Sequence, residues 1–294
     1  MSNILALPQE SDTYPQIFNK DNFSFRCAYL RSNESRSYGD PGQDFIAVKT
    51  MPDVFMFALC DGVSQSFLGN IGARYLGLGL MQWLEACEDT FEKGRLQASL
   101  STYLVNYSGK VSEEIANYAL SPEMPDMVRT VLEKKRDMGS ESTFVCGRID
   151  FPNRAFNQGR ALFAWMGDSR LRFWCRDRER SDELGTEFIT KQRWSSRKGP
   201  VGGDPHVFAD IIEEESGKMT IDRLLSYSDG IASMDKTDQP ITNNALKRLI
   251  INNMTIPEND DISYLELWLD GVPSYLNTQD DDVKNNGEDM AQQG

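Results

Sequence analysis

The chain has 294 residues, and its 31 basic and 45 acidic residues give it a formal net charge of −14. This excess of acid disfavours general binding to nucleic acid or to an anionic membrane, because both need a positive field. No apolar run approaches the roughly 18 residues of a membrane span, and the N-terminus lacks the basic start and apolar stretch of a signal peptide, so we expect a cytoplasmic protein.

The first part of the chain predicts an extension followed by strands. Residues 1–21 are expected to form an N-terminal extension that is partly disordered. The alternating pattern of residues 23–31 predicts a strand, and the polar residues 32–43, which include glycine and proline, predict a loop. Two apolar strands joined by a tight turn are expected over 44–60.

A helical block comes next. Apolar residues at three- and four-residue steps predict a helix over 71–84, and two more amphipathic stretches over 94–119 and 126–137 extend the block. Three strands are predicted after it, over 143–149, 161–165 and 171–175.

The last third begins with residues 177–220, which are charged and rich in glycine and are predicted to be irregular. The remaining elements are a strand that ends at 224–227, a helix near 241–253 and a final strand over 262–269. Residues 271–294 are expected to be an acidic, disordered tail. Strands, a helical block and more strands favour an α+β layered domain over 22–270.

The chain has five cysteines, an odd number with no C-x-x-C pair. Their surroundings are apolar or strand-like. They therefore predict small buried thiols and argue against disulfides or zinc ligands.

Acidic residues stand where the predicted strands begin or end, at the rim of the apolar core. They are Asp44, Asp61, Asp168, Asp229, Asp260 and Asp261. A carboxylate in such a place needs a partner, and a hard cation is the commonest way to satisfy several that converge on one point. The glycines that follow Asp61 and Asp229 allow a sharp turn and bring a carbonyl close to the same point. Oxygen ligands of this kind suit Mg²⁺ or Mn²⁺.

The most specific motifs are Gly167-Asp168-Ser169-Arg170 and Ser228-Asp229-Gly230. The others are Gln43-Asp44, Asp61-Gly62-Val63, Ser142-Thr143 and Asp260-Asp261-Ile262-Ser263. In this order and at these intervals, the set resembles the type 2C protein phosphatases, the metal-dependent PPM family, over about residues 22–270. The resemblance implies a four-layer α-β-β-α sandwich with two central antiparallel sheets.

The resemblance also implies a role for each acidic residue. Asp61 would bridge two metal ions. Asp229 and Asp260 would hold the first ion, the Gly62 carbonyl would hold the second, and Asp44 would reach the second through water.

Asp168, together with Asp229, would hold a weaker third ion, as in the bacterial members of the family. The implied cofactors are therefore two Mg²⁺ or Mn²⁺ ions and a third. The implied reaction is hydrolysis of phosphoserine or phosphothreonine in proteins, by in-line attack of a hydroxide that bridges the two metals.

Two departures from the family pattern are informative. Many animal members carry a histidine after the Asp-Gly pair, whereas this chain has Val63, which indicates a bacterial-type enzyme. The only histidine, His206, is expected to be a loop or strand residue and not a catalyst. The pair before the last strand is Asp260-Asp261; we assign the metal role to Asp260 and keep Asp261 as the alternative.

The phosphate-binding arginine of the family would stand where this chain has Gly39. We take Arg36 as the substitute, catalytic together with Asp61, and Arg31 as the second choice. An arginine is expected because its planar guanidinium matches phosphate oxygens. The competing interpretation of Arg36 is a solvated loop residue.

The expected partners are a phosphoprotein substrate and an opposing serine/threonine kinase in a signalling pathway, with the protein acting as a monomer. The alternative function is a catalytically weak or inactive phosphatase-like module with a regulatory or binding role, which the unusual loop before Asp44 motivates. Against it, every position expected to carry a metal-binding carboxylate still has one. Other hydrolase signatures, such as G-x-S-x-G, G-x-x-x-x-G-K-[ST] and H-E-x-x-H, do not occur.

Overall fold

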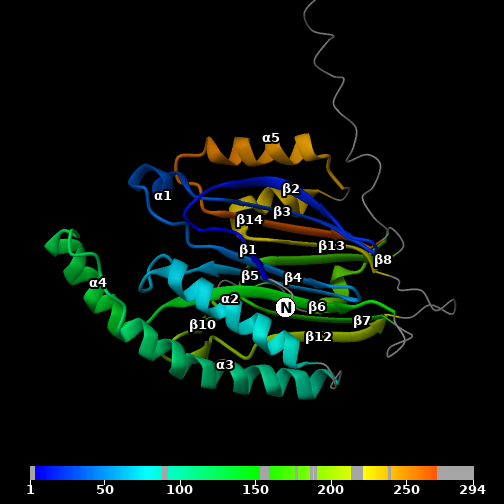
Figure 1. The fold of residues 1–294 in the computed structure, drawn as a ribbon, viewed down its shortest axis with the longest axis horizontal. Helices are drawn as coiled ribbons and strands as arrows, with labels where there is room; N and C mark the ends of the chain where they lie inside the picture. Colours follow the sequence, from blue (N-terminus) through cyan, green and yellow to red (C-terminus); the bar gives the residue numbers. More distant parts are fainter. Residues whose placement is uncertain are drawn as a thin grey trace, which may run out of the picture.

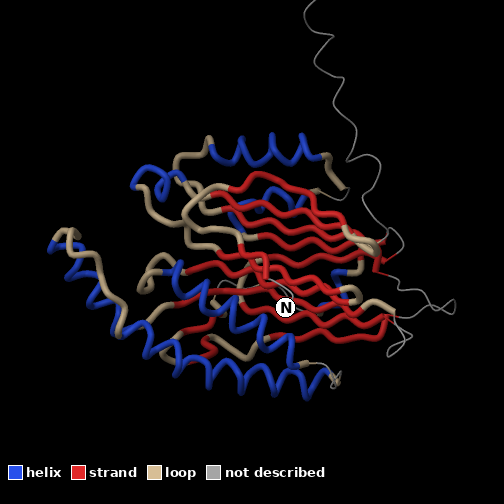
Figure 2. The backbone as a smooth tube through the Cα atoms, viewed as in Figure 1, coloured by secondary structure: helices blue, strands red, loops and turns tan. Residues whose placement is uncertain are grey.

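The computed structural model describes residues 4–87, 92–152, 159–175, 178–185, 188, 191–212, 221–237 and 240–269. Its centre is a pair of antiparallel sheets, drawn in red in Figure 2, with helices on their outer sides. The first sheet contains β1 (Ile4–Ala6), β4 (Phe45–Met51), β5 (Val54–Gly62), β6 (Glu141–Asp150), β7 (Gly159–Met166), β10 (Arg193–Ser195), β11 (Gly199–Val201) and β12 (His206–Ile212).

The second sheet has the order β2-β3-β14-β13-β8-β9. Its strands are β2 (Thr13–Asn19), β3 (Ser24–Leu30), β8 (Arg170–Cys175), β9 (Arg178–Glu179), β13 (Ile221–Tyr227) and β14 (Ile262–Trp268). All strand pairs in both sheets are antiparallel among the described residues.

Helices cover the outer face of each sheet (Figure 1). Those on the side of the first sheet are α2 (Gly69–Ala86), α3 (Lys93–Ala116) and α4 (Asp126–Met138), and those on the side of the second are α5 (Asn243–Met254) and the 3-10 helix η2 (Asp229–Lys236). Two short helices, α1 (Asn33–Tyr38) and η1 (Ser181–Leu184), lie in connections. The predicted four-layer α-β-β-α sandwich is confirmed.

Three apolar cores hold the layers together. Phe25, Phe57 and Phe163 belong to the core between the two sheets, and each is at most 2% exposed. A second core joins the first sheet to α2 and α3, and a third joins the second sheet to α5 and η2. Burial of a side chain such as phenylalanine contributes about 1.5–3 kcal/mol, so the core between the sheets fixes how the strand ends meet.

The helix boundaries follow from the local sequence. Leu76, Leu80 and Leu84 recur every four residues in α2 and are fully buried, which confirms the apolar stripe predicted over 71–84. In α5 the Thr242 hydroxyl accepts a hydrogen bond from Ala245 N at 3.1 Å, an N-cap of the usual kind.

Three expectations are corrected. The described part of the N-terminal extension predicted to be partly disordered belongs to the fold, because residues 4–6 and 13–19 are strands paired into the two sheets. The predicted loop 32–43 contains α1, whose N-cap is Ser32. The segment 177–220 is not irregular throughout, since it contains β12, which pairs with β7 over seven residues. The tail predicted over 271–294 lies outside the described residues.

All five cysteines are buried and form no disulfide, as predicted. Within the described residues, the helices do not include one that is long and apolar enough to cross a membrane.

Candidate metal centre

Two aspartates meet at one end of the first sheet. Asp44 immediately precedes β4, and Asp61 is the penultimate residue of β5. The antiparallel register pairs Phe45 with Cys60, so the next residues outward, Asp44 and Asp61, become neighbours across the two strands. On the other side of β5, the Ser142 hydroxyl donates to the backbone carbonyl of Asp61 at 2.8 Å. This contact holds the end of the strand in place.

Two more aspartates meet at the corresponding end of the second sheet. Asp168 lies in the turn that leads from β7 in the first sheet to β8 in the second. Arg170 pairs with Tyr227 in the register of β8 and β13, and two residues further out this register brings Asp168 opposite Asp229. The turn between the sheets therefore carries Asp168 to the point where both sheets end.

The two sheets bring Asp61, Asp168 and Asp229 into one cluster. One carboxylate oxygen of each lies within 4.8 Å of the other two. These residues are far apart in sequence, and each sits at the end of a different strand or turn. Within the described part of the chain, these three are the motif residues whose carboxylates form such a cluster.

The charges in the cluster oppose one another. Burial is the largest cause that raises the pKa of Asp61 well above its usual range, followed by the neighbouring carboxylates of Asp44, Asp229, Asp260 and Asp168. Like charges at this distance favour the neutral form of the acid. Without a cation, this arrangement is therefore costly at neutral pH.

Asp229 behaves in the same way but less strongly. Its side chain keeps contact with solvent, yet the surrounding atoms withhold enough water to raise its pKa to about 6, with Asp260 and Asp168 adding to the rise. The Arg170 guanidinium offsets part of this effect. Arg170 also donates to the backbone carbonyl of Asp168, so it steadies the turn.

Asp44 shows that the residues fit a cation. It is 2% exposed, and its Oδ2 has no hydrogen-bond partner among the described residues. Burial and the carboxylates of Asp261 and Asp260 raise its pKa well above the usual range. A buried carboxylate oxygen without a donor, beside further carboxylates, is the donor set that Mg²⁺ or Mn²⁺ prefers.

Asp260 and Asp261 have different surroundings. Asp260 is exposed, and its charge raises the pKa values of both Asp61 and Asp229. Its carboxylate accepts a hydrogen bond from the backbone nitrogen of Asp261 at 2.8 Å. Asp261 is buried, and its carboxylate accepts hydrogen bonds from the backbone nitrogens of Ser32, at 2.5 Å, and Gln43. Asp261 therefore ties together the two ends of the segment before Asp44, and Asp260 remains the candidate ligand.

Gly62 lets three segments approach closely. A Cβ atom added to it would lie 2.4 Å from the carbonyl oxygen of Gly69 and 2.8 Å from that of Gln43. Any side chain here would separate the end of β5 from the start of α2 and from the residue before Asp44. The glycine is thus required by packing at this position.

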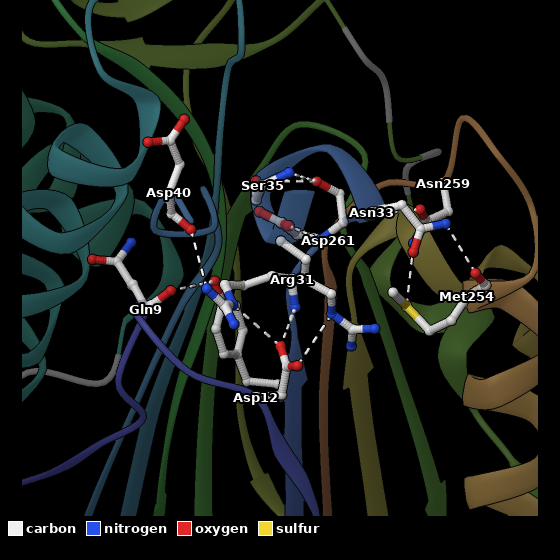
Figure 3. A network of polar contacts seen from close by, with 12 residues as sticks. Gln9, Asp12, Arg31, Asn33, Ser35, Asp40, Met254, Asn259 and Asp261 are labelled. Atoms are coloured by element: carbon white, nitrogen blue, oxygen red, sulfur yellow. Dashed lines mark hydrogen bonds and ion pairs between the residues drawn. The ribbon is translucent and has the colours of Figure 1, made fainter. Parts of the chain in front are cut away.

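Among the described residues, no contact joins Arg36 to the clustered aspartates Asp61, Asp168 and Asp229. Its Nε lies 3.1 Å from a carboxylate oxygen of Asp12. The second choice, Arg31, packs nearer to the site: a Cβ added to Gly42 would lie 2.9 Å from both Arg31 Cγ and Asp261 Oδ2. Figure 3 shows Arg31 and Asp261 in the same network of polar contacts.

Two residues of this network are not expected from the sequence. The Gln9 amide donates to the backbone carbonyls of Asp44 at 3.1 Å and Asn70 at 2.9 Å, and Asp12 contacts both arginines. Both belong to the N-terminal segment. The signal that could have revealed this segment is the run Tyr14, Ile17 and Phe18, residue types that favour strands, although Pro15 interrupts it.

His206 lies in β12, and its contacts with other described residues do not indicate a role in acid catalysis. Its Nε2 is 2.9 Å from Gln192 Oε1, and its ring stacks on Trp165 with centroids 5.4 Å apart. Burial and, to a lesser extent, the charge of Lys93 lower its pKa, which favours the neutral ring. The expectation of a strand residue agrees with this position.

Several solved structures are similar to this chain. The catalytic domain of the serine/threonine protein phosphatase PstP, solved with two manganese ions, is 14% identical with a TM-score of 0.50, over 84% of this chain and 97% of that one. The serine/threonine phosphatase Stp1 from Staphylococcus aureus is 15% identical with a TM-score of 0.48, over 92% and 96%. PppA from Pseudomonas aeruginosa is 15% identical with a TM-score of 0.45, over 84% and 98%.

At the level of sequence, no protein-family model and no curated protein matches the chain. The likeness to the PstP domain establishes that the chain has the fold of the bacterial type 2C phosphatases.

Proposed function

We propose that this chain, which has the type 2C phosphatase fold, is a metal-dependent phosphatase that hydrolyses phosphoserine and phosphothreonine in proteins. The observation that carries the proposal is the convergence of Asp61, Asp168 and Asp229, with carboxylate oxygens within 4.8 Å of one another. Their mutual repulsion opposes folding at neutral pH unless a cation is bound. Strongly shifted acids of this kind are typical of functional sites.

The proposed ligands come from both sheets. Asp61, Asp229, Asp260, Asp44 and the Gly62 carbonyl would hold two divalent cations. The two manganese ions of the PstP domain support two as the minimum number. Mg²⁺ and Mn²⁺ both suit a site made of carboxylate, carbonyl and water oxygens.

Asp168 is proposed to hold a third, weaker ion together with Asp229. When bound, the divalent cations would supply an acidified water and neutralise charge on the phosphoryl oxygens. The chain's own groups do the rest of the work. Ser142 fixes the backbone of Asp61, and the guanidinium groups of Arg31 and Arg36 would bind and orient the phosphoryl oxygens.

The biological setting of this activity is also a proposal. We assign it to the cytoplasm, because five buried thiols without a disulfide suit a reducing compartment. The proposed partners are a phosphoprotein substrate and the serine/threonine kinase that opposes the phosphatase. The protein is proposed to act as a monomer.

The decisive experiment uses the purified full chain with p-nitrophenyl phosphate and with a phosphothreonine peptide, each with Mn²⁺, Mg²⁺ or EDTA. We expect hydrolysis that depends on the metal and falls on the order of 100-fold in Asp61→Asn. The matched control is Asp53→Asn, which removes an acid from the turn between β4 and β5, at the far end of the strand that carries Asp61. A wild-type rate of hydrolysis no higher than that of Asp61→Asn would refute the proposed phosphatase activity.

A regulatory or binding module remains the second candidate, favoured by the pairing of Arg36 with Asp12. Such a module would bind Mn²⁺ and the phosphopeptide in calorimetry without releasing phosphate.

The proposed specificity for phosphoserine and phosphothreonine has its own test. If a phosphotyrosine peptide of the same sequence is hydrolysed at an equal rate, the restriction to serine and threonine is removed.

A further inference from the structure

The N-terminal segment reaches two arginines through a single carboxylate. Asp12 Oδ1 accepts hydrogen bonds from the backbone nitrogen of Arg31 at 3.0 Å and from its Nε at 3.3 Å. Asp12 Oδ2 lies 3.1 Å from Arg36 Nε and forms an ion pair with it, without hydrogen-bond geometry. Both guanidinium groups are largely withdrawn from solvent, with 17% and 27% of their side chains exposed. One negative charge therefore holds two positive charges in a fixed relation.

The same segment also supports the backbone on which Asp44 stands. The Gln9 carbonyl accepts from Gly42 N at 2.9 Å, and the Gln9 amide donates to the carbonyl of Asp44 at 3.1 Å. Arg31 Nη1 donates to the carbonyl of Asp40 at 3.3 Å. Figure 3 shows Asp12, Arg31 and Asp40 joined by contacts, with Gln9 in the same network.

Asp12 cannot easily leave these arginines. It directly precedes β2, whose pairing with β3 begins at Thr13 opposite Tyr29. Its Oδ1 also accepts a hydrogen bond from the backbone nitrogen of Arg31. An anion that competed for the guanidinium groups would leave this hydrogen bond in place. A carboxylate tied down in this manner orients the guanidinium groups and is poorly suited to act as a displaceable substitute for phosphate.

The arginines keep donors for another anion. Asp12 and Asp40 engage Arg31 through its Nε and Nη1, and an arginine has five N–H donors. Arg36 Nη2 is buried and has no hydrogen-bond partner among the described residues. The pair of arginines with Asp12 has a net charge of one positive unit, which favours binding of an anion.

We infer that Asp12 is a positioning residue of the phosphatase site: it orients Arg31 and Arg36 so that their remaining N–H groups bind the phosphoryl group of the substrate. This inference rests on the proposed function and adds to it a residue from outside the aspartate motifs. Asp12 itself touches neither substrate nor metal.

The test compares the metal-loaded full chain with Asp12→Asn, Asp12→Glu and the matched control Asp21→Asn. Asp21 is an exposed acid beyond the other end of β2. With p-nitrophenyl phosphate, Asp12→Asn should raise KM about 10-fold and leave kcat near the wild-type value. Asp12→Glu should restore part of the wild-type KM, because glutamate keeps the negative charge beside the two arginines. Asp21→Asn should behave as the wild type.

A second measurement does not depend on turnover. Calorimetric titration with inorganic phosphate should give a dissociation constant about 10-fold weaker in Asp12→Asn, whereas the affinity for Mn²⁺ stays that of the wild type. In a background of Arg31→Met and Arg36→Met, Asp12→Asn should have no further effect on phosphate binding, because the residues act as one unit.

The outcomes separate the two proposals. A fall in kcat with KM and phosphate affinity unchanged would mean that Asp12 only stabilises the fold, and tighter phosphate binding by Asp12→Asn would mean that Asp12 competes with the substrate. Either result overturns the positioning role and leaves the phosphatase proposal standing. If the wild type binds phosphate but does not turn over, the phosphatase proposal fails, and the phosphate titration still decides the role of Asp12.

Discussion

The carboxylate of Asp261 lies 2.5 Å from the backbone nitrogen of Ser32, 229 residues earlier in the chain, and it also accepts from the nitrogen of Gln43. One buried side chain thus closes the segment that leads into Asp44. Its neighbour Asp260 is exposed, and its charge raises the pKa values of Asp61 and Asp229. We propose separate tasks for the two adjacent acids, one in the architecture and one in the candidate metal centre.

These separate tasks predict opposite phenotypes for two adjacent substitutions. Asp261→Ala leaves the buried backbone N–H of Ser32 and the partly buried N–H of Gln43 without an acceptor, which costs about 1–3 kcal/mol for a buried group. It should lower the free energy of unfolding measured by urea denaturation in EDTA. Asp260→Ala should leave that free energy near or above the wild-type value and weaken Mn²⁺ binding in calorimetry. If Asp261→Ala abolished metal binding in a folded protein, the assignment of the two residues would be reversed.

Asp61→Asn should stabilise the metal-free protein. Burial and four neighbouring carboxylates raise the pKa of Asp61, so removing its charge relieves repulsion. Each kcal/mol relieved should raise Tm by about 2–4 °C, measured by differential scanning fluorimetry in EDTA. With Mn²⁺ the order should reverse, because the wild type gains the binding energy and the mutant loses a ligand. Asp53→Asn, the control, should show neither effect, and a lower Tm for Asp61→Asn in EDTA would contradict the repulsion.

The stability of the metal-free protein should depend on pH through Asp229. Its folded-state pKa is about 6, above the ordinary value of 3.8. A raised folded pKa means that the stabilising contribution is fully present below 3.8 and is lost as the pH rises through about 6. The Tm of the wild type minus that of Asp229→Asn, in EDTA, should therefore fall between about pH 4 and pH 7. A difference that rises over this interval would show that Asp229 is held charged by a partner.

Gly230→Ala should disturb the centre from its second sheet. A Cβ atom at this position would lie 1.9 Å from the carbonyl oxygen of Asp261, so the backbone that carries Asp260 must move. We expect a loss of about 1–3 kcal/mol in the free energy of unfolding and weaker Mn²⁺ binding. Gly109→Ala in α3 is the matched control, because nothing lies within 4 Å of the added atom. This control should gain up to about 1 kcal/mol; equal effects of the two substitutions would rule out the steric explanation.

Local sequence patterns determined much of this protein. The leucine stripe of α2 has a period that only a helix satisfies. Apolar strands that end in Asp61 and before Asp229 place these acids at the rim of a core, since strand ends are where buried segments reach solvent. Periodicity and strand ends are properties of neighbouring residues, so the layered α+β class and the residues Asp44, Asp61, Asp168 and Asp229 could be named from the sequence. The four-layer sandwich followed from the family resemblance.

Only the tertiary structure decided which of these residues meet. The distinction between Asp260 and Asp261 depends on backbone nitrogens of Ser32 and Gln43, which no local pattern reveals. The seven-residue pairing of β12 with β7 gives order to a segment that is too charged and glycine-rich to predict a strand. Likewise, Asp12 gains its place from the pairing of β2 with β3 and from two arginines, one 19 and one 24 residues later in the chain. Contacts between distant segments are fixed by sheet register and core packing, and therefore the surroundings of the arginines could be known only from the fold.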